Sequence, residues 1–196
     1  MAANEVRIIG GNWKGRKLRF PEAPGLRPTL GRVRVTLFNW LGPRLVGSRC
    51  LDLFAGSGAL GFEALSRGAA AVTLVEDNRR AAQTLRANAA LLKAGPACSI
   101  AATSAARFLR EPHPCWDIIF LDPPFDADLL PGVLQRIRSA DCLCPDGTIY
   151  FEMPRRAPAD FPGFAVVKES TAGDTRFGLL AAEVAGGPAG IGPGTP

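Results

Sequence analysis

The sequence has a single histidine, at position 113, and no pair of cysteines in a Cys-x-x-Cys arrangement. Its five cysteines are an odd number scattered along 196 residues. These shortages argue against a zinc site and against a disulfide framework, because both usually need clustered or evenly paired cysteines. We therefore expect no metal. His113 stands between two prolines and is expected at the surface of a loop, whereas Cys115 is expected to be structural.

Long apolar runs are also missing. No stretch approaches the length of a membrane span, and the N-terminus lacks the charged-then-apolar layout of a signal peptide. With 196 residues and 47% hydrophobic content, the chain is long enough to bury one substantial core and a small appendage. We expect a soluble, cytoplasmic protein with one main domain and no membrane contact.

Acidic residues are scarce in the first quarter of the chain. Residues 1–49 contain ten basic residues and two acidic ones, although the net charge of the whole chain is only +5. A concentrated basic segment beside a more acidic body indicates a polyanion, held by the first and processed by the second. The alternative is an ordinary solvated basic face. If the polyanion is RNA, the expected contacts are Arg7, Arg16, Lys17, Arg27, Arg32 and Arg34.

What the sequence does have is a glycine-rich turn between an apolar run and a helical pattern. Residues 50–54 read as a buried strand, and Gly56-x-Gly58-x-x-Gly61 leads into helical spacing. Such glycines let a ligand lie against bare backbone at the helix N-terminus. The spacing also fits a dinucleotide fingerprint. Asp52 at the strand end favours S-adenosylmethionine (SAM) instead, because a carboxylate repels pyrophosphate but attracts the ammonium and sulfonium charges of SAM.

Two more strand ends carry candidate cofactor contacts. A second apolar run ends at Glu76, where an acid can accept hydrogen bonds from both ribose hydroxyls. Asp77 and Asn78 follow at the start of a helix expected over 79–92, and either they contact the cofactor or they simply cap that helix. A weaker strand precedes Ser104, which stands where this fold class often meets the adenine.

The second informative stretch is Asp122-Pro123-Pro124-Phe125, directly after an apolar strand over 116–121. Each proline fixes its own φ and biases the preceding residue to an extended shape, so the backbone is rigid. An exocyclic amine has two N–H donors, and the Asp122 carboxylate and the Pro123 carbonyl can accept them. Those bonds would orient the nitrogen toward a methyl donor, and Phe125 would stack on the base. The alternative is a plain proline turn with a helix-capping acid.

The remaining patterns complete an α/β domain behind an N-terminal extension. Alternation over 6–20 predicts a β-hairpin, and helical spacing begins after Thr29 and ends at Gly42-Pro43. Three later strands are expected, the last two as an antiparallel pair, over 144–152, 164–167 and 177–181. We divide the chain into a basic extension over 1–46, a catalytic domain over 47–185, and a glycine- and proline-rich tail over 186–196 that is expected to be disordered.

Together these stretches resemble the RsmD family of bacterial 16S rRNA guanine-N2 methyltransferases, which act on the guanine at position 966. The resemblance rests on 52–61, 63–69 and 122–125, and on N-terminal blocks that include Arg27-Pro28-Thr29 and Leu37-Phe38-Asn39-Trp40-Leu41. It implies a Rossmann-like SAM-dependent fold with a seven-stranded, mostly parallel sheet and helices on both faces. It also implies RNA held by the N-terminal hairpin and helix, and a partly or fully assembled small ribosomal subunit as substrate.

The resemblance also implies which residues form the site, because the family's functional motifs match named positions of this sequence. The implied cofactor set is Asp52, Phe54, Gly56, Gly58, Glu76, Asp77 and Ser104, and the implied base-side set is Asp122, Pro123, Pro124 and Phe125. The chain departs from the family pattern at Val35, where an acid is usual, and at Ser104, where Asp or Asn is common. Two alternatives remain: methylation of DNA or of a protein amide, and a ribosome assembly factor that binds SAM without catalysis.

Overall fold

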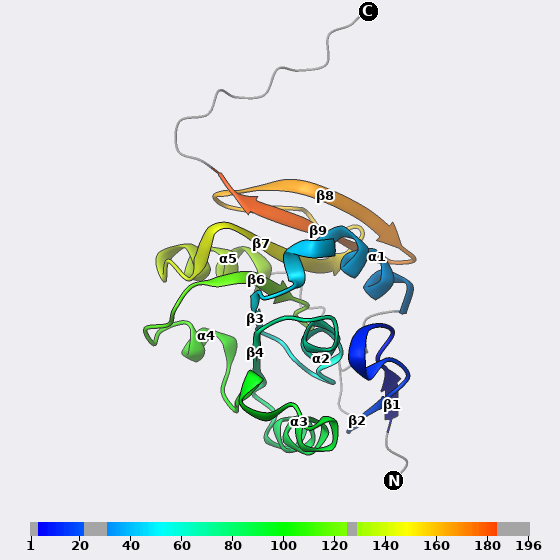
Figure 1. The fold of residues 1–196 in the computed structure, drawn as a ribbon. Helices are drawn as coiled ribbons and strands as arrows, with labels where there is room; N and C mark the ends of the chain where they lie inside the picture. The colour runs from blue at the N-terminus through cyan, green and yellow to red at the C-terminus, as the bar shows by residue number, and fades with distance from the viewer. Residues whose placement is uncertain (1–3, 22–30, 125–128, 184–196) are drawn as a thin grey trace, which may run out of the picture.

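The computed structural model describes residues 4–21, 31–124 and 129–183. Its centre is a seven-stranded sheet with the strand order β5-β4-β3-β6-β7-β9-β8, and a separate two-stranded sheet pairs β1 with β2 (Figure 1). The strands are β1 (Asn4–Arg7), β2 (Lys17–Phe20), β3 (Arg49–Asp52), β4 (Ala71–Val75), β5 (Cys98–Ala101), β6 (Trp116–Leu121), β7 (Leu143–Pro154), β8 (Phe164–Ala172) and β9 (Thr175–Ala182). The α-helices are α1 (Gly31–Leu41), α2 (Ala59–Ser66), α3 (Arg79–Leu92), α4 (Ala105–Phe108) and α5 (Leu129–Ser139). Short 3-10 helices are η1 (Gly11–Trp13), η2 (Gly42–Leu45) and η3 (Gly95–Ala97).

The sheet is mostly parallel, as predicted. Strands β5, β4, β3, β6 and β7 pair in parallel, whereas β9 runs antiparallel to both β7 and β8. Strands that are covered on both faces need nearly continuous apolar sequences. Five of the six residues of β6 are buried, which is why its run of large apolar residues lies at the centre. The prediction of a closing antiparallel pair is confirmed.

Helices cover both faces of the sheet, as Figure 1 shows. One core cluster joins residues of α1, α2 and α3, such as Leu37, Phe62 and Leu85, to one face. A second cluster joins α4 and α5, through Phe108 and Leu134, to the other face. This arrangement is the Rossmann-like α/β fold expected from the sequence.

The N-terminal hairpin packs on the sheet domain. Its strands pair antiparallel, with Val6 opposite Leu18, and these residues belong to the same core cluster as α2 and α3. The charged residues between them, Arg7, Lys17 and Arg19, are exposed. The predicted hairpin and its two faces are therefore confirmed.

Polar side chains from two helices hold the backbone of this hairpin. Glu63 of α2 accepts hydrogen bonds from the backbone N–H groups of residues 9 and 10, at 2.7 and 2.8 Å. Ser66 of α2 bonds to two backbone groups within 10–13, at 2.9 and 2.6 Å. Asn88 of α3 pairs with the backbone N–H and C=O of Arg19, at 3.2 and 2.8 Å. The hairpin is thus fixed to the two helices that follow β3 and β4.

The predicted helix boundaries hold where the structure describes them. Helix α1 ends at Leu41, directly before the glycine and proline expected to stop it, although a 3-10 turn continues to Leu45. Asn78 caps α3 by accepting hydrogen bonds from the N–H groups of residues 80 and 81. Thr29, the acids expected to open α5 at 126 and 128, and the tail over 186–196 lie outside the described residues.

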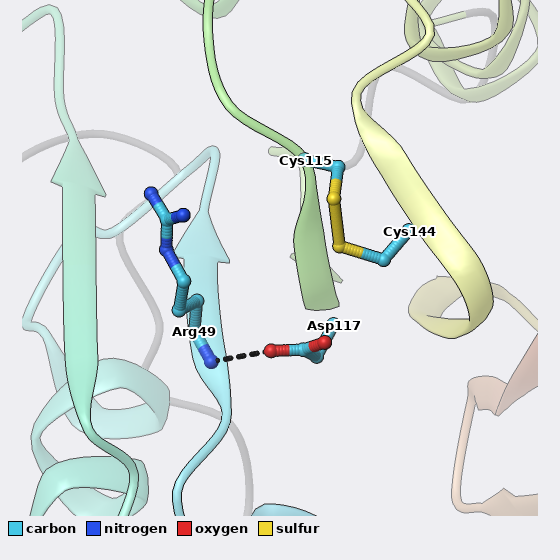
Figure 2. The surroundings of a disulfide bond; sticks show 4 residues. All are labelled: Arg49, Cys115, Asp117 and Cys144. Carbon is cyan, nitrogen blue, oxygen red and sulfur yellow. Dashed lines mark hydrogen bonds between the residues drawn. A yellow bond between two sulfur atoms is a disulfide. The ribbon is translucent and has the colours of Figure 1, made fainter.

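Cys115 and Cys144 form a disulfide bond, which corrects the prediction of no disulfide (Figure 2). Cys115 directly precedes β6, and Cys144 is the second residue of the neighbouring strand β7. Beside the bond, the carboxylate of Asp117 accepts a hydrogen bond from the backbone N–H of Arg49 at 2.8 Å. Spacing along the chain does not reveal such a bond, because strand adjacency brings the two cysteines together.

His113 is half-buried, whereas we expected a surface residue. Its ring stacks on Phe108 with a centroid separation of 4.0 Å and lies 5.3 Å from the ring of Trp116. The backbone oxygen of Phe108 is 2.7 Å from its Nε2. The flanking prolines predicted a loop correctly, but the aromatic residues on both sides draw the imidazole inward.

Candidate functional site

Three carboxylates meet at one edge of the sheet, because three adjacent parallel strands end there. Asp52 ends β3, Glu76 follows β4, and Asp122 follows β6. The register places Asp52 opposite Leu74 in β4 and Phe120 in β6, so the three acids lie at neighbouring strand ends. Ligands of open α/β sheets bind outside this carboxyl edge.

The turn after β3 needs glycine at two of its predicted cofactor positions. Gly56 and Gly58 have φ angles of 50° and 77°, in the left-handed region that side chains disfavour. A Cβ on Gly58 would also overlap the ring of Phe62. Phe54, between strand and turn, is half-buried and packs against the core cluster of α4 and α5. The local sequence therefore fixes a tight passage from β3 into α2.

Asp52 is almost fully buried under this turn, with an exposed fraction of 1%. Its Oδ2 accepts a hydrogen bond from the backbone N–H of Gly61 at 3.3 Å. Burial raises the pKa of Asp52 from 3.8 to about 7, and the charges of Asp122 and Glu76 add to the rise. A carboxyl group in this position gains strongly from a bound cation.

Glu76 is held by backbone groups on both sides of the site. One carboxylate oxygen accepts from Gly56 N–H and the other from Asn78 N–H, both at 2.8 Å. Burial raises its pKa, and these two bonds oppose the rise. Asp77 is exposed beside it and contributes a smaller increase to the same pKa. Of the two residues left open between capping and cofactor contact, Asn78 caps α3.

Ser104 also caps a helix. Its hydroxyl accepts a hydrogen bond from the backbone N–H of Arg107 at 3.3 Å, at the start of α4. The residue is exposed and lies three positions beyond the end of β5. Its place next to the β4 end matches the edge expected for an adenine, but its hydroxyl has a structural task of its own.

Asp122 and Pro123 are half-buried at the end of β6, and Pro124 is exposed. Phe125 lies outside the described residues. Asp122 and Pro123 are thus partly shielded from solvent at the carboxyl edge.

Two buried polar residues beside Asp122 were not predicted. Leu121 pairs with Phe151, so Glu152 follows in β7 at the level of Asp122. The hydroxyl of Tyr150 donates to Glu152 Oε1 at 2.7 Å. Burial raises the pKa of Tyr150 well above its ordinary value, and the charges of Glu152 and Asp122 add to this. The signal was the only tyrosine of the chain and an acid at the end of a predicted strand.

The predicted RNA contacts fall into separate places. Arg7, Arg16 and Lys17 are exposed and line a groove of about 810 Å³ between the hairpin and α3. Arg32 is exposed on α1, and Arg27 lies outside the described residues.

Arg34 differs from the expectation of an exposed RNA contact, because only 4% of it is accessible. Its Nη1 donates to the backbone oxygen of Arg7 at 3.0 Å and lies 3.7 Å from Glu63 Oε2. Burial lowers its pKa, and the charge of Glu63 opposes that effect. Arg34 lies between Val33 and Phe38 on the buried face of α1, and the hairpin covers it.

Within the described ranges, no group of three or more histidine, cysteine or acidic side chains has an arrangement that would hold a metal ion. None of the helices described is long and apolar enough to cross a membrane.

Residues 6–181 match the family model described as "Conserved hypothetical protein 95". The chain is 44% identical over 186 residues to "Ribosomal RNA small subunit methyltransferase D" of Escherichia coli K12, which covers 94% of this chain and 93% of that protein. A protein of the same name from Haemophilus influenzae is 42% identical over 91% of this chain and 94% of its own length.

Solved structures are similar over the same extent. A protein described as "Putative methyltransferase yhhF from Escherichia coli" superposes with a TM-score of 0.82 at 43% identity, covering 92% of this chain and 99% of that one. A Haemophilus influenzae protein described as "putative methylase HI0767" gives a TM-score of 0.78 at 40% identity, with coverages of 90% and 98%.

Proposed function

Because the chain belongs to the RsmD family, whose members are methyltransferases of small-subunit rRNA, we propose that it transfers a methyl group from SAM to the N2 amine of a guanine in 16S rRNA, at position 966. The proposed substrate is the partly or fully assembled small ribosomal subunit, and the proposed place of action is the cytoplasm. In this proposal, residues 1–46 bind the RNA and residues 47–185 form the catalytic domain.

The observation that carries this proposal is the group of carboxylates at the carboxyl edge of the sheet. Asp52 lies among like charges, since the charges of both Asp122 and Glu76 increase its pKa. Such an edge opposes a pyrophosphate and suits a ligand that carries ammonium and sulfonium charges. This donor set therefore fits SAM better than a dinucleotide.

Each cofactor residue has a task that its position allows. Asp52, buried beneath the glycine turn, would hold the ammonium group of SAM. Glu76, fixed by two backbone N–H groups at 2.8 Å, would accept the ribose hydroxyls. Gly56 and Gly58 keep the backbone bare where the ligand lies. Asp77 and Ser104 are assigned to the rim near the ribose and adenine.

Bound SAM supplies an electrophilic methyl group. The chain's own contribution is to orient the nucleophile: the Asp122 carboxylate accepts one N–H of the guanine amine, and the Pro123 carbonyl accepts the other. These bonds also keep electron density on the nitrogen, and the Asp122 carboxylate would accept the proton that the amine loses when it gains the methyl group. Pro124 makes the backbone rigid, and Phe125 would stack on the base. Orientation is the main source of rate in such a direct displacement.

The test is transfer of labelled methyl from SAM to small subunits prepared without this modification, followed by nuclease digestion and identification of the labelled nucleoside. Label in N2-methylguanosine is the expected result. Label in N6-methyladenosine, in DNA or in a protein amide would show that the proposed substrate is wrong, although the SAM-dependent fold would remain consistent with the result. SAM binding without any transfer would favour the non-catalytic assembly factor.

A further inference from the structure

A groove of about 810 Å³ separates the N-terminal hairpin from helix α3. Its hairpin wall consists mainly of β1, β2 and the connection between them, and its helix wall is one side of α3 (Figure 1). The described residues that line it are Glu5, Arg7, Gly15, Arg16, Lys17, Arg19, Arg80, Gln83, Thr84, Ala87, Asn88 and Leu91.

The groove is strongly basic. Five of these lining residues are arginine or lysine, and Glu5 is the one acid among them. Glu5 pairs with Lys17 at 2.6 Å, but both side chains are well exposed, so water and salt screen that pair. The remaining positive charge is uncompensated by the lining residues that the structure describes, and it favours an anionic ligand.

The charges are spread along the groove. Arg80 lies in the first turn of α3, and the guanidinium of Arg16 donates to the backbone oxygen of Leu91 near its last turn, at 3.0 Å. Eleven residues of α-helix separate these two points, a length of about 16 Å. A chain of phosphates matches this distribution better than one small anion does.

The walls do not slide freely against each other. Asn88 of α3 bonds to both backbone groups of Arg19, at 3.2 and 2.8 Å, in the middle of the groove. Side chains on both walls are therefore presented at a fixed separation. Gln83 adds a neutral donor of the kind that contacts phosphate oxygens, whereas the hydroxyl of Thr84 donates to the backbone oxygen of Arg80 at 3.0 Å.

One end of the groove reaches the cofactor edge. Arg80 follows Asn78 by two residues, and Asn78 N–H donates to Glu76 at 2.8 Å. We propose that the groove between the hairpin and α3 binds the sugar-phosphate backbone of the RNA strand that flanks the target guanine, with Arg19 and Arg80 as contacts from opposite walls. This inference rests on the proposed function and adds a helix outside the basic N-terminal segment to the RNA surface.

The experiment compares two double variants of the full chain. Arg19→Gln with Arg80→Gln removes one charge from each wall, whereas Arg110→Gln with Arg136→Gln removes two exposed charges from the α4–α5 side. Filter binding to naked 16S rRNA is measured between about 0.05 and 0.2 M salt. In a plot of the logarithm of the binding constant against the logarithm of salt concentration, each lost phosphate contact makes the slope shallower by about 0.7. The slope for the groove variant should therefore be shallower by about 1.4, and this variant should bind RNA roughly 25-fold more weakly at 0.1 M salt.

Unchanged SAM affinity in both variants, with wild-type RNA binding in the α4–α5 variant, completes the expected result. Equal RNA binding by the two variants, or no RNA binding by the wild type, would contradict the proposal that the groove binds RNA. If the groove variant lost binding to whole subunits but not to naked rRNA, the groove would bind an acidic protein of the subunit instead of RNA. That result would also contradict the proposal. The methyl-transfer assay separates the proposed function from the proposed role of the groove. If the groove variant formed N2-methylguanosine with an unchanged KM, the role of the groove would be wrong and the proposed function would stand.

Discussion

At the scale of single residues, Asp122 is the most direct test of the mechanism. Replacing Asp122 with Ala removes one of the two acceptors for the amine, so kcat should fall by about 100-fold or more. SAM affinity should stay nearly unchanged, because Asp52 and Glu76 remain. Isothermal titration and single-turnover methyl transfer measure the two quantities, and Asp160→Ala, at an exposed acid, is the control. Normal turnover in the variant would remove Asp122 from the reaction.

If Asp52 holds the ammonium group of SAM as proposed, SAM binding should depend on pH. Its pKa of about 7 means that the free protein holds a proton there below neutrality, and binding of a cation requires the carboxylate. SAM affinity should therefore rise by about 20-fold between pH 5.5 and pH 7.5. Asp52→Asn should bind weakly and lose this dependence. A wild-type affinity that stays constant over the same range would contradict the assignment.

The same residue affects folding in the opposite direction. Because the pKa of Asp52 is raised from 3.8 to about 7, the folded state holds a proton that the unfolded chain releases near pH 4. The contribution of Asp52 to the free energy of unfolding is greatest below pH 4 and declines as pH rises to about 7. Asp52 therefore contributes least to the stability of the ligand-free protein at the pH where the proposed SAM binding is strongest.

At the scale of elements, Glu63 joins α2 to the hairpin. It is fully buried, accepts from two backbone N–H groups and pairs with Arg67 at 2.7 Å. Glu63→Ala leaves Arg34 buried without this carboxylate and should lower the free energy of unfolding by about 3–5 kcal/mol. Glu169→Ala, which breaks an exposed pair with Arg176, should cost less than about 1 kcal/mol. Urea unfolding compares the two, and equal losses would count against this role.

The elements themselves were largely predictable, because hydrophobic spacing and glycine or proline stops are local signals. The strand β6 and helix α3 illustrate this, since their bounds match the expected 116–121 and 79–92. Contacts between distant segments were not predictable in the same way. The disulfide depends on β7 lying beside β6, and the burial of Arg34 depends on a hairpin docking over α1. Tyr150 and Glu152 were missed because their place beside Asp122 follows from strand order rather than from a motif.

At the scale of the whole molecule, the hairpin and the sheet should unfold together. Trp13 packs against the core cluster on the α1–α3 face, and Trp116 belongs to the cluster on the opposite face. Variants that keep one tryptophan, with the others replaced by Phe, report on each side separately by fluorescence. In each variant the fluorescence midpoint in urea should coincide with the midpoint from far-UV circular dichroism, as expected for one cooperative unit. An earlier transition at Trp13 would show that the extension over 1–46 is a separate folding unit.

The position of the hairpin also sets an order of events during synthesis. Residues 4–20 leave the ribosome before the helices on which their apolar face packs, and the last of these helices ends at Leu92. At translation rates of about 5–20 residues per second, the last of these contacts becomes available roughly 4–15 s after Phe20 is made. Until then the nascent chain presents its densest positive charge and an uncovered apolar strand pair together. A protein proposed to act on ribosomal RNA therefore leaves the ribosome with its basic hairpin exposed until α3 has been made.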